Sequence, residues 1–459
     1  MKNMRTMMRN ISSVGCQKTL QWAAYGSILA AALVVLWNPP AASAQTLTTY
    51  DATATDTGTF PSAINLGGTV AGVYDDGAGQ HGFLRAPDGT ITTFDPGLAP
   101  TPFCTTGSTS IVPSGAINSA GAVVGDCNGV TSGTQVVFLR DPLGNFTEIT
   151  PPENNVHDGM GVFPTINDSG EIAGSYTDVT AKVHGFVVTP PYGPGNYTNF
   201  DLPGETFGLE VVSINNSGQV AGYYYTSSSF STAYGFLMVS PGMFTTIPAP
   251  GSDQILEVTS MNDNAEITGF SLLNYSSPFH GFTWQSGTTT PFDVAGETST
   301  EAEGINFSGT IVGNAYDASA GEGFVRNAAG TITTFVAEPT ASYTQPQGVN
   351  ALGTIAGIWL DSAFMRHGFI ETPAPAAAVP NLISLLSNPS LGLRAGEVVA
   401  LSDILHLALV SINAGQNDLA TLELNGFIVA VQVLQRLHQI SALTASTLIT
   451  GAQATIALL

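Results

Sequence analysis

Positive charge is scarce in this chain of 459 residues, which has 11 Lys and Arg against 34 Asp and Glu. Four of the basic residues (Lys2, Arg5, Arg9 and Lys18) lie within the first 18 positions, and no acidic residue precedes Asp51. The rest of the chain therefore has a formal charge of −27, from 34 acidic and seven basic residues. Such a surface repels phosphate backbones, which argues against nucleic acid as a partner.

Cysteine is also rare, with three residues in the chain. None lies in a CxxC or Cys/His spacing that would hold zinc. Cys16 lies near the N-terminus, whereas Cys104 and Cys127 are close together in the sequence. In an oxidising compartment this pair predicts one disulfide, with two free buried thiols as the alternative.

The chain lacks the usual short motifs of catalysis and nucleotide binding. It has no Gly-x-Ser-x-Gly nucleophile motif and no Gly-Lys-Ser/Thr phosphate loop. The acidic turns at 75–77 and 168–171 lack the spacing of a calcium loop, so calcium binding is only a minor alternative. The sequence therefore predicts no catalytic, cofactor-binding or metal-binding residue.

No uninterrupted apolar run reaches the ~20 residues of a membrane span. A mostly apolar segment from Trp22 to Trp37 follows the basic N-terminus and precedes Ala42-Ser43-Ala44. This order predicts a secretory signal peptide over 1–44, with a retained membrane anchor as the alternative. We therefore expect a secreted protein, extracellular or at the cell surface, with the periplasm as another location.

Glycine is abundant, with 51 residues, and much of it belongs to a repeat. The motif apolar-Asn-x-x-Gly-x-[Val/Ile]-x-Gly occurs seven times at a spacing of 44 to 53 residues, with Ala265 replacing the first Gly of the fifth copy. The repeat asparagines are Asn65, Asn118, Asn167, Asn215, Asn262, Asn306 and Asn350. A Gly-Phe block follows in six copies, preceded in four of them by His81, His184, His280 or His367. We interpret both sets as structural residues of the repeat.

Each repeat predicts four short strands, because β-branched and aromatic residues alternate with Gly, Asp and Asn. Four strands per ~40–50 residues is typical of a propeller blade, and a β-helix is the competing architecture. We therefore expect a mainly β fold, a seven-bladed β-propeller of four-stranded repeats over 45–372.

The seventh repeat lacks its fourth strand, and a matching segment lies at the other end of the chain. Residues 46–51 (TLTTYD) closely resemble residues 90–95 (TITTFD). We expect this N-terminal strand to complete the last blade and remove an exposed sheet edge. The predicted closing residues are Thr46, Leu47, Thr48, Thr49 and Tyr50.

The repeated Ile-Asn-x-x-Gly-x-Ile-x-Gly…His-Gly-Phe pattern resembles the HAF-type extracellular repeats of bacteria. The resemblance covers about residues 46–372, with His-Gly-Phe here in place of the usual His-Ala-Phe. It implies an exported bacterial repeat protein and carries no assigned activity.

Composition changes after residue 372. The Pro- and Ala-rich stretch 373–381 predicts a linker, and 382–459 predicts a small helical domain because apolar residues recur at helical spacing. This domain could be a cap on the propeller, or it could serve oligomerisation or attachment to the cell envelope. Self-association through 382–459 is thus one alternative, and no transmembrane span is expected in the mature chain.

Residues that break the repeat are better site candidates than those that form it. The off-pattern charged residues are Glu153, His157, Asp158, Glu210, Glu301, Glu303, Asp361 and Arg366. The aromatic residues Tyr223, Tyr225 and Trp284 are expected to be exposed contacts. We expect a non-enzymatic scaffold that binds extracellular carbohydrate or protein. A polysaccharide hydrolase or lyase that uses paired carboxylates is one alternative, and a structural envelope protein is another.

Overall fold

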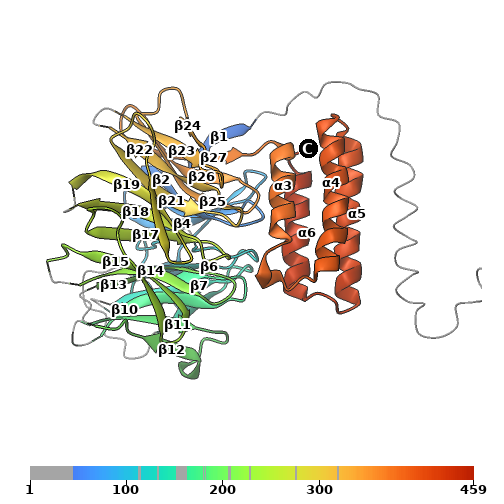
Figure 1. The fold of residues 1–459 in the computed structure, drawn as a ribbon. Coiled ribbons are helices and arrows are strands. Elements are labelled where there is room, and N and C mark those ends of the chain that lie inside the picture. The colour runs from blue at the N-terminus through green and yellow to red at the C-terminus, as the bar shows by residue number, and fades with distance from the viewer. Residues whose placement is uncertain are drawn as a thin grey trace, which may run out of the picture.

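The computed structural model describes residues 45–111, 115–131, 134–150, 163–178, 180, 182–204, 208–226, 229–273, 276–317 and 320–459. The repeat asparagines of all seven repeats line a central space, which we call the channel. A group of helices packs against one face of the β-sheets (Figure 1). The predicted signal peptide, residues 1–44, lies outside the described residues.

Within the described ranges the strands form six sheets, and five of these are separate blades. The first separate blade consists of β2 (Gly58–Ile64), β3 (Val70–Asp75), β4 (Gln80–Arg85) and β5 (Ile91–Phe94), and the second of β6 (Val123–Asn128), β7 (Gln135–Arg140) and β8 (Phe146–Ile149). The third consists of β9 (Thr165–Ile166), β10 (Ile172–Thr177), β11 (Val183–Val188) and β12 (Tyr197–Phe200), and the fourth of β13 (Gly208–Ile214), β14 (Val220–Tyr225), β15 (Ala233–Ser240) and β16 (Met243–Ile247). The fifth consists of β17 (Ile255–Met261), β18 (Ile267–Leu273), β19 (Ser276–Gln285) and β20 (Thr288–Phe292).

The sixth sheet is continuous over eight strands. These are β1 (Thr46–Tyr50), β21 (Ser299–Ile305), β22 (Ile311–Tyr316), β23 (Gly321–Arg326), β24 (Ile332–Phe335), β25 (Tyr343–Val349), β26 (Ile355–Leu360) and β27 (Arg366–Thr372). Its two halves join where β23 pairs in parallel with β25, through Gly321 and Tyr343. The tyrosine ring lies where a Cβ on residue 321 would be, so only glycine permits this approach.

The prediction of a seven-bladed β-propeller of four-stranded repeats is therefore wrong, because the structure has five blades, although the mainly β class and the helical C-terminal segment are present. Five blades are separate, and the rest of the ring is the eight-stranded sheet. One separate blade has three named strands, because its innermost segment forms only isolated bridges at Ser110 and Ile117.

The N-terminal strand β1 pairs antiparallel with β27, from Thr46 opposite Thr372 to Tyr50 opposite Gly368. The Tyr50 ring covers Gly368, and the Arg85 guanidinium of the neighbouring sheet lies 4.8 Å from the centre of this ring. Residues from both ends of the repeat region thus form one sheet edge, which packs against β2–β5.

A phenylalanine on the third strand of each repeat fills the core. These seven residues, all 0% exposed, are Phe83, Phe138, Phe186, Phe236, Phe282, Phe324 and Phe369. Each ring lies against the glycine that ends the [Val/Ile]-x-Gly motif. At Gly72, for example, a Cβ would collide with Phe83 and with the Phe60 carbonyl. The motif glycine, which has no side chain, therefore leaves the space that the phenylalanine ring fills.

The helices are α3 (Pro375–Leu385), α4 (Ala395–Asn413), α5 (Asn417–Arg436) and α6 (Ala442–Ile456). The predicted linker at 373–381 is thus mostly helix. Pro375 occupies the first turn, where a proline costs no hydrogen bond, and the alanines after it favour helix. Buried Val379, Leu382 and Leu385 anchor α3 in the core of the helical domain.

The helical domain docks on the turns that follow the repeat asparagines. Leu66, Phe307 and Leu352 project from three of these turns into the same apolar core as the helices. Asn381 of α3 also donates a 3.0 Å hydrogen bond to the Leu352 carbonyl. Among the described helices, α4 alone has the length and composition that could cross a membrane, with a mean hydropathy of 1.7.

Candidate functional site

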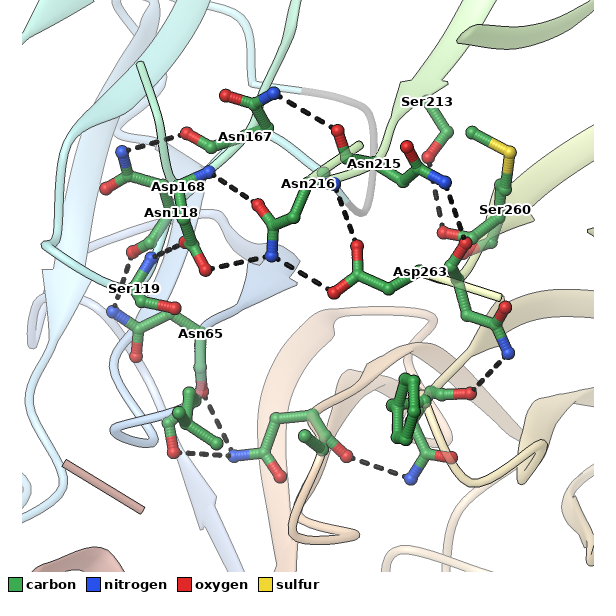
Figure 2. A pocket seen from close by; sticks show the side chains of 18 of the residues that line it. Asn65, Asn118, Ser119, Asn167, Asp168, Ser213, Asn215, Asn216, Ser260 and Asp263 are labelled. Carbon is green, nitrogen blue, oxygen red and sulfur yellow. Dashed lines mark hydrogen bonds between the residues drawn. The ribbon is translucent and has the colours of Figure 1, made fainter. Parts of the chain in front are cut away.

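The repeat asparagines form a closed hydrogen-bonded ring around one end of the channel (Figure 2). Each Nδ2 donates to the backbone carbonyl of the next repeat asparagine, at 2.9 to 3.3 Å. Asn350 completes the ring by donating to the Asn65 carbonyl at 3.0 Å. Each Oδ1 accepts from the backbone N–H four residues later, as in the 2.9 Å bond from Thr354 to Asn350. These asparagines therefore hold the turns and join the repeats.

A second polar chain crosses four neighbouring turns. Asp168 accepts from the Ser119 amide at 2.8 Å, and Asn216 accepts from the Asp168 amide at 2.9 Å. Asp263 accepts from the Asn216 amide at 2.8 Å and from the Asn388 side chain of the helical domain at 2.6 Å. Burial raises the pKa of Asp263. The acidic turn at Asp168, considered above for calcium, takes part in this chain.

A cavity of about 210 Å³ lies inside the asparagine ring. Leu385, Asn388, Leu391 and Thr447 of the helical domain line its outer side. The helical domain therefore covers this end of the channel.

Four glutamates lie on neighbouring innermost strands of one side of the ring. Glu210 of β13, Glu257 of β17 and Glu301 of β21 each lie four residues before the apolar residue that precedes the repeat asparagine. Glu303 lies two residues after Glu301, at the β-bulge between Ala302 and Gly304, and is close enough to interact with the charge of Glu301. All four are half-buried, whereas the residues between and beside them are buried.

The corresponding position is uncharged in the two repeats that follow β21 around the ring, where Gln345 of β25 and Phe60 of β2 occupy it. The backbone carbonyls of Phe60 and Gln345 face the motif glycine of the next strand, as the carbonyls of Glu210 and Glu301 do. The repeat thus keeps one backbone geometry while its channel side chains change from apolar or neutral to acidic.

Hydroxyl and amide donors bind the carboxylates. The Tyr223 hydroxyl donates to Glu210 at 2.5 Å, and the Tyr225 hydroxyl donates to Glu257 at 3.3 Å. Both oxygens of Glu301 accept: Oε1 from Tyr316 at 2.8 Å and Oε2 from Asn314 at 3.1 Å. The Gln345 amide donates to Glu303 at 3.3 Å.

Burial raises the pKa of three of these carboxyl groups, those of Glu210, Glu257 and Glu303. Burial, and then the charge of Glu210, raises the pKa of Glu257 to about 7. Burial, and then the charge of Glu301, raises the pKa of Glu303 to about 8. Burial also raises the pKa of Glu210. No Lys, Arg or His of the described chain forms an ion pair with any of the four.

Aromatic rings accompany the glutamates. Phe270, Phe279, Tyr316 and Tyr343 form a continuous series with centroid separations of 5.7, 6.4 and 6.1 Å. Tyr225 lies 5.9 Å from Tyr223 and 5.0 Å from Phe230. The glutamates and the aromatic rings therefore lie on the same side of the channel. Hydroxyl groups of the tyrosines in this aromatic set donate hydrogen bonds to the glutamates. We define Glu210, Glu257, Glu301, Glu303, Tyr223, Tyr225, Tyr316 and Tyr343 as the channel site.

The structure brings together three of the off-pattern charges found in the sequence, namely Glu210, Glu301 and Glu303. Sequence analysis missed Glu257, although its context, Leu-Glu-Val, repeats that of Glu210. Asp361 instead caps a hairpin turn by accepting from the Ala363 and Met365 amides.

Two other sequence-predicted residues, Arg366 and Trp284, do not belong to this site. Arg366 lies over the Phe60 ring at 5.4 Å from its centroid. Trp284, expected to be exposed, is only 4% exposed, because it packs against Ile267 and Val258 in a blade core. Tyr225 is also buried, at 7%. Glu153, His157 and Asp158 lie outside the described residues.

The repeated histidines connect strands within the sheets. Each Nδ1 lies 2.6 to 2.9 Å from an aspartate just after an outermost strand. The pairs are His81 with Asp95, His184 with Asp201, His280 with Asp293, and His367 with Asp51. No cluster of three or more potential metal ligands occurs among the residues that the structure describes.

Cys104 and Cys127 form a disulfide with a Cα separation of 5.8 Å. Both residues are buried, and Cys127 lies on β6. The bond connects this strand to the long segment that replaces a regular innermost strand in the three-stranded blade.

No protein-family profile matches this sequence, and no curated protein matches it. Solved structures with a similar fold include a streptogramin B lyase, with a TM-score of 0.48 and 14% identity over 71% of this chain and 97% of that chain. Another is the β-propeller domain of the Trilobed protease from Pyrococcus furiosus, with a TM-score of 0.46 and 8% identity over 68% of this chain and 95% of that chain. At these values the likeness says nothing about activity. The chain has a propeller fold.

Proposed function

We propose that the protein is a secreted carbohydrate-binding propeller and that the channel site binds the sugar. The observation that supports this most is the placement of carboxyl groups directly beside aromatic rings on one side of the ring. Sugar hydroxyl groups donate to carboxylate and tyrosine oxygens, while the apolar face of a sugar ring packs on an aromatic ring. Sites of this kind combine apolar walls with a few placed polar groups.

The charge of the site limits the type of sugar. The glutamates, which have no ion-pair partner in the described part of the chain, and the chain's strong net negative charge disfavour a uronate or sulfated polymer. A neutral or amino-bearing polysaccharide fits better, because its hydroxyl or ammonium groups are hydrogen-bond donors.

Glycoside hydrolysis is a second candidate function, favoured by the pair Glu301 and Glu303. A carboxyl group with a pKa near 8 remains protonated at neutral pH, as a general acid requires, and a neighbouring carboxylate can activate water. In this reaction Glu303 would protonate the glycosidic oxygen while Glu301 accepts a proton from the attacking water. Both oxygens of Glu301 already accept hydrogen bonds from Tyr316 and Asn314, which favours simple binding over this reaction.

The test uses protein starting at Gln45 with a neutral glucan, a neutral mannan, chitosan and a polyuronate. Each polymer is chromatographed by size before and after incubation. Co-elution with a neutral or amino polymer of unchanged length is expected. Glu301→Gln should lose this co-elution, whereas Glu148→Gln, on an exposed outer strand, should keep it. Shortened polymers would instead support hydrolysis, and no interaction with any polymer would contradict both functions.

A further inference from the structure

Helix α5 forms part of the outer layer of the helical domain, away from the propeller (Figure 1). Its apolar side chains Ala420, Leu424 and Phe427 are buried among the other helices. On the opposite side, Leu422 is 67% exposed and Val429 is 58% exposed. In a soluble protein, large apolar residues on an outward helical stripe indicate a contact surface.

Gly426 lies in the interior of α5, between these two exposed residues. A Cβ at this position would meet no atom within 4 Å, so the packing of a single chain does not require glycine there. Glycine is one of the least favourable residues in a helix interior. A close approach by the backbone of another helix would explain it.

The charges of α5 are complementary to a reversed copy of the same helix. Asp418 and Arg436 lie nine residues before and nine residues after Phe427. Leu422, Val429 and Arg436 are seven residues apart, and Asp418 lies one turn before Leu422, so all four follow one stripe. Neither Asp418 nor Arg436 forms an ion pair within the described chain.

We propose that the protein forms a symmetric dimer in which α5 packs antiparallel to α5 of a second copy and crosses it at Gly426. Asp418 then lies opposite the partner's Arg436 at both ends of the crossing, and Leu422 and Val429 fill the contact between them. A twofold axis near Phe427 generates both ion pairs from one surface.

The available surface is of suitable size for such an interface. Helices α4 and α5, with 19 and 20 residues, are each about 30 Å long and ~10 Å wide. Together they offer roughly 600 Å² in projection, comparable to the ~800 Å² per partner of a stable interface. Val399 and Val410 of α4 are 61% and 59% exposed, and the exposed Asp403 and His406 lie between them along the same stripe.

The first test measures the mass of the protein from Gln45 by sedimentation equilibrium at several concentrations. The expected mass is twice that of the chain. Gly426→Gln should be monomeric but should melt at an equal or higher temperature than the wild type, because its side chain meets no atom of its own chain. The matched control is Gly396→Gln, another exposed helical glycine with open space around it, which should remain dimeric.

The second test reverses the charges. Asp418→Arg and Arg436→Asp should each weaken the dimer by about tenfold, because each places like charges at both ends of the crossing. The double variant should recover most of the affinity. A wild-type monomer at all concentrations, or no recovery in the double variant, would overturn the proposal. A monomer that co-sediments with phospholipid vesicles would overturn it in favour of a lipid surface.

Discussion

His367 Nδ1 lies 2.7 Å from Asp51 Oδ1, although 316 residues separate them in the sequence. The same histidine–aspartate pair occurs in three other repeats between residues that are only 13 to 17 positions apart. In the last repeat, the aspartate follows β1, near the N-terminal end of the described residues. Together with the β1–β27 ladder, this pair closes the ring.

A shortened protein that begins at Ala52 should therefore lose stability throughout the ring. The loss of β1 exposes the edge of β27 and removes the contacts of the Tyr50 ring with Gly368 and Arg85. We expect one cooperative thermal transition shifted down by several degrees, since contacts across the closure are lost together. Calorimetry compares it with the protein from Gln45. Equal melting temperatures would show that β1 does not close the ring.

The channel glutamates predict that the protein becomes less stable as the pH rises from about 4.5 to 8. The folded pKa of Glu303 is raised from 4.5 to about 8, and that of Glu257 to about 7. In this range the folded protein holds protons that the unfolded chain has released, so rising pH favours unfolding. Below pH 4.5 this contribution to stability is fully present.

The variant Glu303→Gln should reduce this pH dependence and raise the melting temperature at pH 8 by about 2 °C or more. Melting curves from pH 5 to 8 measure both effects, and Glu148→Gln on the exposed outer strand β8 serves as the control. A slope unchanged from that of the wild type would mean that Glu303 is ionised throughout this range.

Gly321→Ala should destabilise the junction inside the eight-stranded sheet. Its methyl group would collide with the Tyr343 ring, and we expect a loss of about 1–3 kcal/mol from overpacking. Denaturant unfolding gives the free energy. Gly396→Ala, at an exposed helical position, should be neutral or stabilising. Adding Tyr343→Ala should make Gly321→Ala less harmful, and equal effects in both backgrounds would rule out this collision.

Asn306→Ala should destabilise the asparagine ring. The substitution removes the acceptor of the Thr310 amide and the donor to the Asn350 carbonyl, and both groups lie in a buried environment. We expect a loss of about 2–3 kcal/mol in the free energy of unfolding. Asn199→Ala, on an exposed outer strand, is the control and should change stability by less than about 0.5 kcal/mol.

The repeat units and the closing strand could be predicted from the sequence because their determinants are local. The Asn-x-x-Gly turn and the [Val/Ile]-x-Gly strand each specify their conformation within about nine residues. The joining of β23 to β25 depends on Gly321 meeting Tyr343, a contact between repeats that no local pattern reveals. The helix at 375–385 was missed because its prolines indicated a linker, although Pro375 lies where a helix tolerates it.

The channel site could be predicted only in part. Glu210, Glu301 and Glu303 broke the repeat pattern, but their convergence depends on which strands are innermost. Glu257 had the same position in its repeat and was overlooked. Trp284 was expected at the surface, yet its strand β19 lies within a blade and buries its ring between sheets.

The pairing of β1 with β27 also imposes an order in time. The first strand to be synthesised finds its partner only after more than three hundred further residues have been added. At ~5–20 residues per second, this delay is on the order of 15 to 65 seconds. Until then, β1 has no sheet to join, and the sheet β2–β5 lacks its neighbour across the closure. The ring can therefore close only after the repeat region has been made, so its closure is a late step in folding.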